Sequence, residues 1–174
     1  IDNKTKTEFV WQGDEKYWKG HSPVLFPQCG RIFNQKYLYY GEEFEMGLHG
    51  FARHTEFKIE NKTNSSIELF IEDNEETRKI YPFKFRFVVG YKLNNETLEF
   101  TFRVINKDNK EIYFSYGGHP GFNCPIGGVG NFDDYYLEFT KSSYKQRKFT
   151  ENFLYNFEIF AFDKNKRQIN YYIV

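Results

Sequence analysis

The sequence predicts an all-β protein built from antiparallel strands. Its apolar residues include 21 Phe and 14 Tyr against a single Met, and aromatic residues favour strands. In several segments apolar and polar residues alternate with a period of two, which is typical of a sheet with one buried face. The length of 174 residues suits one domain, since domains commonly contain about 50 to 250 residues. We therefore expect residues 1–174 to form a single domain.

Two hairpins in the middle of the chain are the clearest elements. Thr55–Glu60 and Ser66–Glu72 are predicted as paired strands, and Phe83–Leu93 is predicted to pair with Thr97–Ile105 across an Asn-Asn turn. Along the second hairpin, every other residue is apolar and the intervening ones are mostly polar. This pattern indicates a sandwich sheet, with one face packed and the other in water.

The other elements are shorter. Asp73 or Asn74 is expected to cap a helical turn at Glu75–Arg78, because carboxylates follow the cap and Pro82 closes the segment. Further strands are predicted at Tyr37–Tyr40, Glu42–Met46, Glu111–Tyr116, Tyr135–Phe139, Phe157–Phe162 and Gln168–Val174.

Charge and composition exclude several classes of partner. Lys plus Arg and Asp plus Glu each number 24, and the signs are interspersed, so no basic face for nucleic acid or anionic lipid is predicted. No apolar run approaches the roughly 18 residues that a membrane span requires. Cys29 and Cys124 are too few for a disulfide framework and are expected to be reduced. We expect a soluble cytoplasmic protein, monomer or homodimer, whose partner is a small molecule.

One histidine stands in a sequence that suggests chemistry. His119 lies in Gly117-Gly118-His119-Pro120-Gly121-Phe122-Asn123, where Pro120 favours an extended conformation at His119 and the glycines permit close backbone approach. Histidine exchanges protons near neutral pH. The alternative for an isolated histidine is a plain turn residue, and the surrounding motif favours the chemical role.

Further candidates lie in two other glycine-containing turns. His49 and Arg53 belong to His49-Gly50-Phe51-Ala52-Arg53, and Arg31 follows Gly30. A guanidinium offers a fixed fork of donors for hydroxyl or anionic oxygens. The alternative is a turn at a strand entry with Arg53 in a surface ion pair. Trp11 and Trp18 could stack on a sugar ring, although core packing is the more common role of such residues.

No metal site and no nucleophilic triad is predicted. The histidines and cysteines are scattered, without Cys-X-X-Cys, His-X-His or His-Glu-X-X-His spacing. No serine lies in a nucleophile-elbow sequence.

Several motifs, taken in order, resemble the aldose 1-epimerase (galactose mutarotase) family and its LacX-like branch. They are Trp11-Gln12-Gly13-Asp14, Pro23-Val24-Leu25-Phe26-Pro27, Gly30-Arg31, His49-Gly50-Phe51-Ala52-Arg53, Tyr81-Pro82-Phe83 and the His119 motif. The resemblance implies a large antiparallel β-sandwich with a sugar cleft, and an isomerase that interconverts aldose anomers without a cofactor.

The resemblance also implies residue roles. His119 matches the catalytic acid, His49 a second histidine that contacts substrate, Arg31 an arginine that binds sugar hydroxyls, and Arg53 an additional cleft residue. The family's base is a late glutamate in a Glu-Pro-like context. No Glu-Pro follows Phe139, so no base is nominated, and we expect the sandwich to be incomplete at both ends.

Two other functions stay open. A hexose-6-phosphate mutarotase resembles this family and shares the His-Gly-Phe-Ala-Arg stretch, but this chain has Lys19-Gly20-His21-Ser22 where that branch has an arginine-glycine pattern. A carbohydrate-binding domain without activity fits the aromatic content and the unassigned base. It does not explain the retained histidine of the acid motif.

Overall fold

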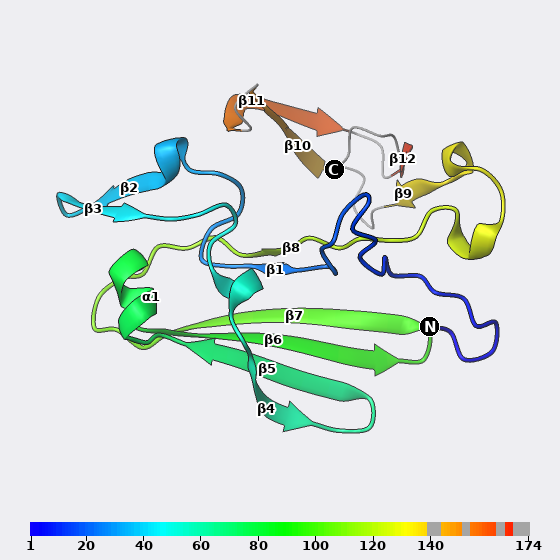
Figure 1. Cartoon of the computed structure of the whole chain (residues 1–174), viewed down its shortest axis with the longest axis horizontal. Coiled ribbons are helices and arrows are strands. Elements are labelled where there is room, and N and C mark those ends of the chain that lie inside the picture. The colour runs from blue at the N-terminus through cyan, green and yellow to red at the C-terminus, as the bar shows by residue number, and fades with distance from the viewer. Residues whose placement is uncertain (139–143, 151–153, 163–165, 169–174) are drawn as a thin grey trace. The chain divides into compact units, whose positions relative to one another are not determined.

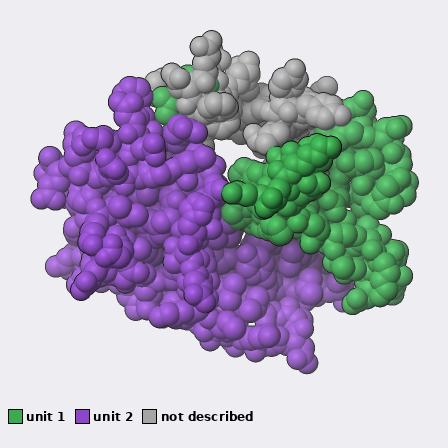
Figure 2. Space-filling model, viewed as in Figure 1, with its two compact units in different colours: residues 1–23, 118–174 green, residues 24–117 purple. Residues whose placement is uncertain are grey.

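Antiparallel strands form most of the regular structure in this protein. The structure is a computed structural model that describes residues 1–138, 144–150, 154–162 and 166–168. The chain divides into two units, shown in separate colours in Figure 2: unit 1 comprises Ile1–Pro23 and Gly118–Val174, and unit 2 comprises Val24–Gly117. The described residues contain a single α-helix, of six residues, so the prediction of an all-β protein is confirmed. No helix in the described ranges has the length and apolar character needed to cross a membrane.

The main sheet of unit 2 consists of the two predicted hairpins. Strands β4 (Lys58–Lys62), β5 (Ser66–Glu72), β6 (Phe85–Asn94) and β7 (Thr97–Asn106) follow one another in space in chain order (Figure 1). All three pairs are antiparallel. The sequential order follows from short hairpin turns, which place neighbouring strands side by side.

Register sets the buried face of this sheet. Ile71 lies opposite Phe87, which in turn lies opposite Val104. Side chains of residues directly opposite one another in neighbouring strands point to the same face of the sheet. Phe87 is fully buried and Ile71 is 4% exposed. At the far end of the hairpin the same face is open, since Leu98 and Phe100 are 48% and 43% exposed. The predicted packed face is therefore confirmed for the inner half of the hairpin only.

Phe26 lies at the centre of the core of unit 2. Its ring is fully buried and stacks on Phe87, with the ring centroids 4.5 Å apart. Complete burial of a side chain of this size contributes about 1.5–3 kcal/mol. The buried cluster consists of Val24, Phe26, Met46, Ala52, Ile71, Tyr81, Phe83, Phe85, Phe87 and Val89.

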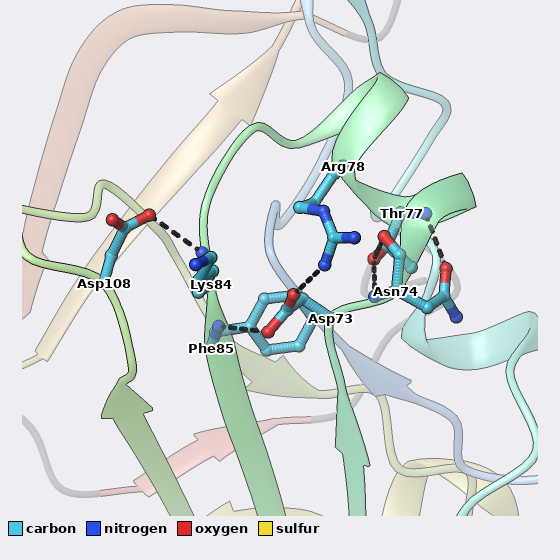
Figure 3. Close-up of polar contacts among 7 residues, drawn as sticks. All are labelled: Asp73, Asn74, Thr77, Arg78, Lys84, Phe85 and Asp108. Carbon is cyan, nitrogen blue, oxygen red and sulfur yellow. Dashed lines mark hydrogen bonds and ion pairs between the residues drawn. The ribbon is translucent and has the colours of Figure 1, made fainter.

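The helix α1 (Glu75–Ile80) begins as the sequence predicts, and Asn74 is the cap (Figure 3). The backbone N–H of Thr77 donates to Asn74 Oδ1 at 2.9 Å, and the backbone N–H of Asn74 donates to Thr77 Oγ1 at 2.8 Å. Asp73 has a different role, because its carboxylate accepts the backbone N–H of Phe85 at 3.1 Å and forms an ion pair with Arg78. The helix is thereby tied to the start of β6.

The remaining strands form small two-stranded sheets. In unit 2, β2 (Lys36–Tyr39) pairs with β3 (Glu42–Glu45), as predicted to within one residue. β1 (Val24–Leu25) pairs with β8 (Gly117–Gly118).

In unit 1, two pairs of strands come from the later part of the chain. β9 (Tyr136–Glu138) pairs with β12 (Lys166–Gln168), and β10 (Tyr144–Phe149) pairs with β11 (Tyr155–Phe162). β9 and β11 confirm two predicted strands, whereas β10 was not predicted. The predicted strand Gln168–Val174 lies outside the described residues except for Gln168.

The prediction of a strand at Glu111–Tyr116 is wrong. The segment has no strand ladder, and the backbone N–H of Ser115 donates to Pro27 O at 2.8 Å outside any ladder. Its apolar pattern comes from docking on the core, since the ring of Phe114 contacts that of Phe26. The predicted strand Thr55–Glu60 starts later, at Lys58, because Thr55 still closes the preceding turn.

Candidate functional site

The four predicted site residues belong to two units. His119 lies in unit 1, whereas Arg31, His49 and Arg53 lie in unit 2.

In unit 2, the turn that carries His49 is bonded reciprocally to Gly30. The backbone N–H of His49 donates to Gly30 O at 3.0 Å, and the backbone N–H of Gly30 donates to His49 Nδ1 at 3.0 Å. An atom that accepts a hydrogen bond presents a lone pair, so in the neutral ring the proton lies on Nε2. The turn thus holds Nδ1 of His49 as an acceptor, and Nε2–H is the hydrogen-bond donor of the neutral ring.

Gly50 explains why this turn needs glycine. Its φ is +69°, and a Cβ at this position would lie 2.4 Å from the carbonyl oxygen of Phe26. That oxygen accepts the backbone N–H groups of both Phe51 and Ala52, each at 3.1 Å. Only glycine allows this approach. The His49 turn is consequently held against the segment that leads to Arg31.

The two arginines differ in exposure. Arg31 is exposed and directly follows Gly30, so the reciprocal bonds place it beside the His49 turn. Arg53 is half-buried in the 3-10 helix Ala52–His54. The predicted alternative of a surface ion pair for Arg53 is wrong for the described part of the chain, where no carboxylate pairs with it. Its fork of donors is therefore not engaged by an acidic side chain there.

Cys29, which precedes Gly30, is a structural thiol. Its backbone N–H donates to Ser115 Oγ at 2.7 Å, and burial raises the pKa of the Cys29 thiol above its ordinary value. A raised pKa keeps the thiol protonated and poorly nucleophilic at neutral pH. Cys29 and Cys124 are both free thiols. Within the described ranges, no three His, Cys, Asp or Glu side chains come close enough together to hold a metal ion.

In unit 1, His119 is fixed by its backbone and by one aromatic neighbour. Its N–H donates to Pro23 O at 3.0 Å, and the N–H of Gly121 donates to Ser22 Oγ at 3.0 Å. The imidazole lies against the indole of Trp18, with ring centroids 5.1 Å apart and an interplanar angle of 43°. The Nδ1 atom is buried. These backbone bonds and the Trp18 ring thus fix the position of His119 in unit 1.

The contact between Trp18 and His119 was missed in the sequence, where both tryptophans were considered as sugar-stacking residues. Trp11 has its indole N–H bonded to the carbonyl oxygen of Trp18 at 2.6 Å, and it is half-buried. The only sequence signals were Gly20 and Gly121, which leave the space that the Trp18 ring occupies.

Unit 2 also contains a cavity that Arg31, His49 and Arg53 do not line. It has a volume of about 650 Å³ and is lined mainly by aromatic side chains, which come from residues 37–40, from Tyr81 and Phe83 after α1, and from residues 113–114. The hydroxyls of Tyr37 and Tyr81 in its wall donate to the backbone carbonyls of Ile80 and Tyr113, at 2.7 and 3.1 Å. The predicted site residues of unit 2 therefore do not coincide with this cavity.

Comparison with known proteins assigns the family. The sequence pattern of the family described as "Aldose 1-epimerase" matches residues 1–168. The plasmid-encoded protein LacX of Lactococcus lactis subsp. lactis is 37% identical over 147 residues, which are 81% of this chain and 49% of LacX. The chain therefore spans about half the length of this relative.

Two crystal structures are similar in sequence and in fold. A galactose mutarotase related enzyme from Lactobacillus acidophilus is 38% identical with a TM-score of 0.85, covering 94% of this chain and 55% of that protein. A galactose mutarotase-like protein from Lactobacillus casei is 30% identical with a TM-score of 0.80, covering 93% and 57%.

These matches and the described strands define a β-sandwich protein of the galactose mutarotase-like fold, and the chain belongs to the aldose 1-epimerase family. Within that family it belongs to the LacX-like branch. The resemblance seen in the sequence motifs is thereby confirmed. The roles of individual residues stay predictions.

Proposed function

We propose that this protein is an isomerase that interconverts the α and β anomers of a free aldose by acid/base ring opening and reclosure. Family membership over residues 1–168 supports a mutarotase-like function. The observation that carries the proposal is the rigid presentation of His119 by a hydrogen-bonded backbone and by Trp18. A proton donor must be held in one place to act on one atom of its substrate.

The proposed reaction moves only protons. Ring opening protonates the ring oxygen and removes the proton of the anomeric hydroxyl, and rotation about the C1–C2 bond before reclosure exchanges the anomers. His119 is proposed as the acid, and one placed proton-transfer group typically contributes about 10² to 10⁴ in rate. No residue is assigned as the base. A reaction of this kind uses no redox or group-transfer cofactor.

The residues of unit 2 are proposed to bind the sugar. The neutral ring of His49 offers Nε2–H, and Arg31 and Arg53 offer guanidinium donors for hydroxyl oxygens. Donors of this kind fix the orientation of a substrate and stabilise negative charge that develops on oxygen. Arg31→Ala is therefore expected to raise KM as well as lower kcat.

The test compares sugars in solution. Anomer exchange of freshly dissolved α-glucose and α-galactose is followed by polarimetry, with the 6-phosphates of both sugars in parallel. The proposal predicts acceleration of the free sugars, with less for the phosphates, because the expected phosphate-binding arginine is replaced in Lys19-Gly20-His21-Ser22. Preference for the 6-phosphates would favour a hexose-6-phosphate mutarotase. Sugar binding in a titration without any acceleration would favour a carbohydrate-binding protein.

A further inference from the structure

In unit 1, Trp18 packs on His119, and Trp11, Gly20 and Gly121 lie against Trp18. These four residues form what we call the Trp18 seat. The indole of Trp18 lies 5.1 Å from the imidazole of His119, measured between ring centroids. Trp18 is itself held at its backbone, because its N–H donates to Asp14 O at 2.9 Å and its carbonyl accepts the indole N–H of Trp11 at 2.6 Å. Both the backbone and the ring of Trp18 are therefore constrained.

Two glycines leave room for the Trp18 ring. A Cβ at Gly20 would lie 2.5 Å from the ring atoms Cε2 and Cζ2, and a Cβ at Gly121 would lie 2.8 Å from Cζ3. Real Cβ atoms essentially never approach other atoms this closely. Neither glycine has a positive φ, so the requirement at both positions is space for the indole and not an unusual backbone conformation.

Two backbone hydrogen bonds fix the main chain at and near His119. His119 N–H bonds to Pro23 O, and the carbonyl of Gly121 accepts the N–H of Trp11 at 3.0 Å. The segments around Trp11 and His119, more than a hundred residues apart in the chain, are thus joined by backbone bonds on one side and by ring packing on the other. These contacts explain why Trp18 is half-buried, and no bound sugar is needed to explain it.

We propose that Trp18 is a positioning residue for His119: its indole holds the imidazole in the orientation from which it donates a proton. The catalytic consequence rests on the proposed function, whereas the seat itself does not. Aromatic pairs prefer tilted or offset geometries at centroid distances of about 4.5–7 Å, and the observed pair satisfies this. A displacement of about 1 Å of a reacting group can cost on the order of 10²-fold in rate.

Two variants disturb the seat by different routes. Trp18→Leu removes the aromatic surface, and Gly20→Ala keeps the tryptophan but forces its ring to move. Trp18→Phe is the conservative variant that retains an aromatic face. Phe9→Leu is the matched control, because it exchanges a partly exposed aromatic of the same unit, 43% exposed, for the same aliphatic residue.

The first readout is NMR of the histidine ring protons, with the signals of His119 assigned through His119→Asn. The indole ring current acts on His119 in the native protein, so Trp18→Leu and Gly20→Ala should shift the His119 signals while those of His49 and His54 stay in place. Phe9→Leu should shift none of them. Unchanged His119 signals in Gly20→Ala and in a folded Trp18→Leu protein would overturn the proposal, as would an equal shift in Phe9→Leu.

The second readout is the division between kcat and KM for an aldose. We expect kcat to fall about 10- to 100-fold in Trp18→Leu with KM nearly unchanged, and Trp18→Phe to retain kcat within about threefold. A rise in KM at unchanged kcat would show that Trp18 stacks on the sugar and would overturn the positioning role. If Trp18→Leu and Gly20→Ala shift the His119 signals but the wild-type protein exchanges no anomers, the seat is supported and the proposed function is refuted, so the two failures are distinguishable.

Discussion

The reciprocal hydrogen bonds between His49 and Gly30 predict that two substitutions of His49 differ in their effect on the free energy of unfolding but both lower the rate of anomer exchange. His49→Ala removes the acceptor Nδ1, which lies 3.0 Å from the backbone nitrogen of Gly30. Gly30 is buried, and a buried donor without a partner costs about 1–3 kcal/mol. In His49→Asn the side-chain Oδ1 occupies nearly the position of Nδ1, and asparagine tolerates the positive φ of +65° found at this residue. We therefore expect His49→Asn to stay within about 1 kcal/mol of the wild type.

The assay is urea unfolding of the wild type and both variants, followed by circular dichroism. With a slope of about 1–3 kcal/mol per molar urea, a loss of 2 kcal/mol moves the midpoint by about 1 M. Anomer exchange should fall in both variants, because both lack the Nε2–H donor. Equal midpoints for the alanine and asparagine variants would refute the role of Nδ1 as an acceptor. Full activity in the asparagine variant would refute the role of Nε2–H as a donor.

Three further predictions concern the core, the helix and pH. Phe87→Ala should lower the free energy of unfolding by about 3–5 kcal/mol, because Phe87 is fully buried. Phe100→Ala, at the open end of the hairpin, should lower it much less. Similar losses for the two variants in urea titrations would contradict the described core. Asn74→Ala should cost about 1 kcal/mol in the same assay by removing the acceptor of the Thr77 N–H, and an unchanged midpoint would count against the cap. Burial raises the pKa of Tyr37 to about 12, so its stabilising contribution is complete below its ordinary pKa near 10 and is lost as pH rises towards 12. Between about pH 10 and 12 the free energy of unfolding should therefore fall less steeply with pH in Tyr37→Phe than in the wild type. Equal slopes in the two proteins would contradict this.

The sequence predicts the central sheet well because period-two alternation is a local signal. The predicted strand Ser66–Glu72 has the same first and last residues as β5, and β7 starts at the predicted Thr97. The wrong strand at Glu111–Tyr116 shows the limit of that signal. Aromatic residues that dock on a core produce the same alternation as a strand, and only the hydrogen bonds of a neighbouring strand distinguish the two.

The candidate site residues were chosen from the sequence by residue type, and their geometry could not be predicted. Arg31, His49 and His119 were identified from turns rich in glycine and proline, which are local features. The bond from Gly30 to His49 Nδ1 and the packing of Trp18 on His119 join segments distant in the chain. Nothing in the spacing of these residues shows which ring nitrogen accepts a hydrogen bond or which aromatic ring an imidazole contacts.

The most direct test of the proposed function is anomer exchange measured by NMR on a free aldose at equilibrium, comparing the wild type with His119→Asn. The proposed role of His119 as the acid predicts accelerated exchange in the wild type and a loss of about 10² to 10⁴ in rate in the variant, with the fold retained. Exchange at the wild-type rate in a folded His119→Asn protein would contradict it.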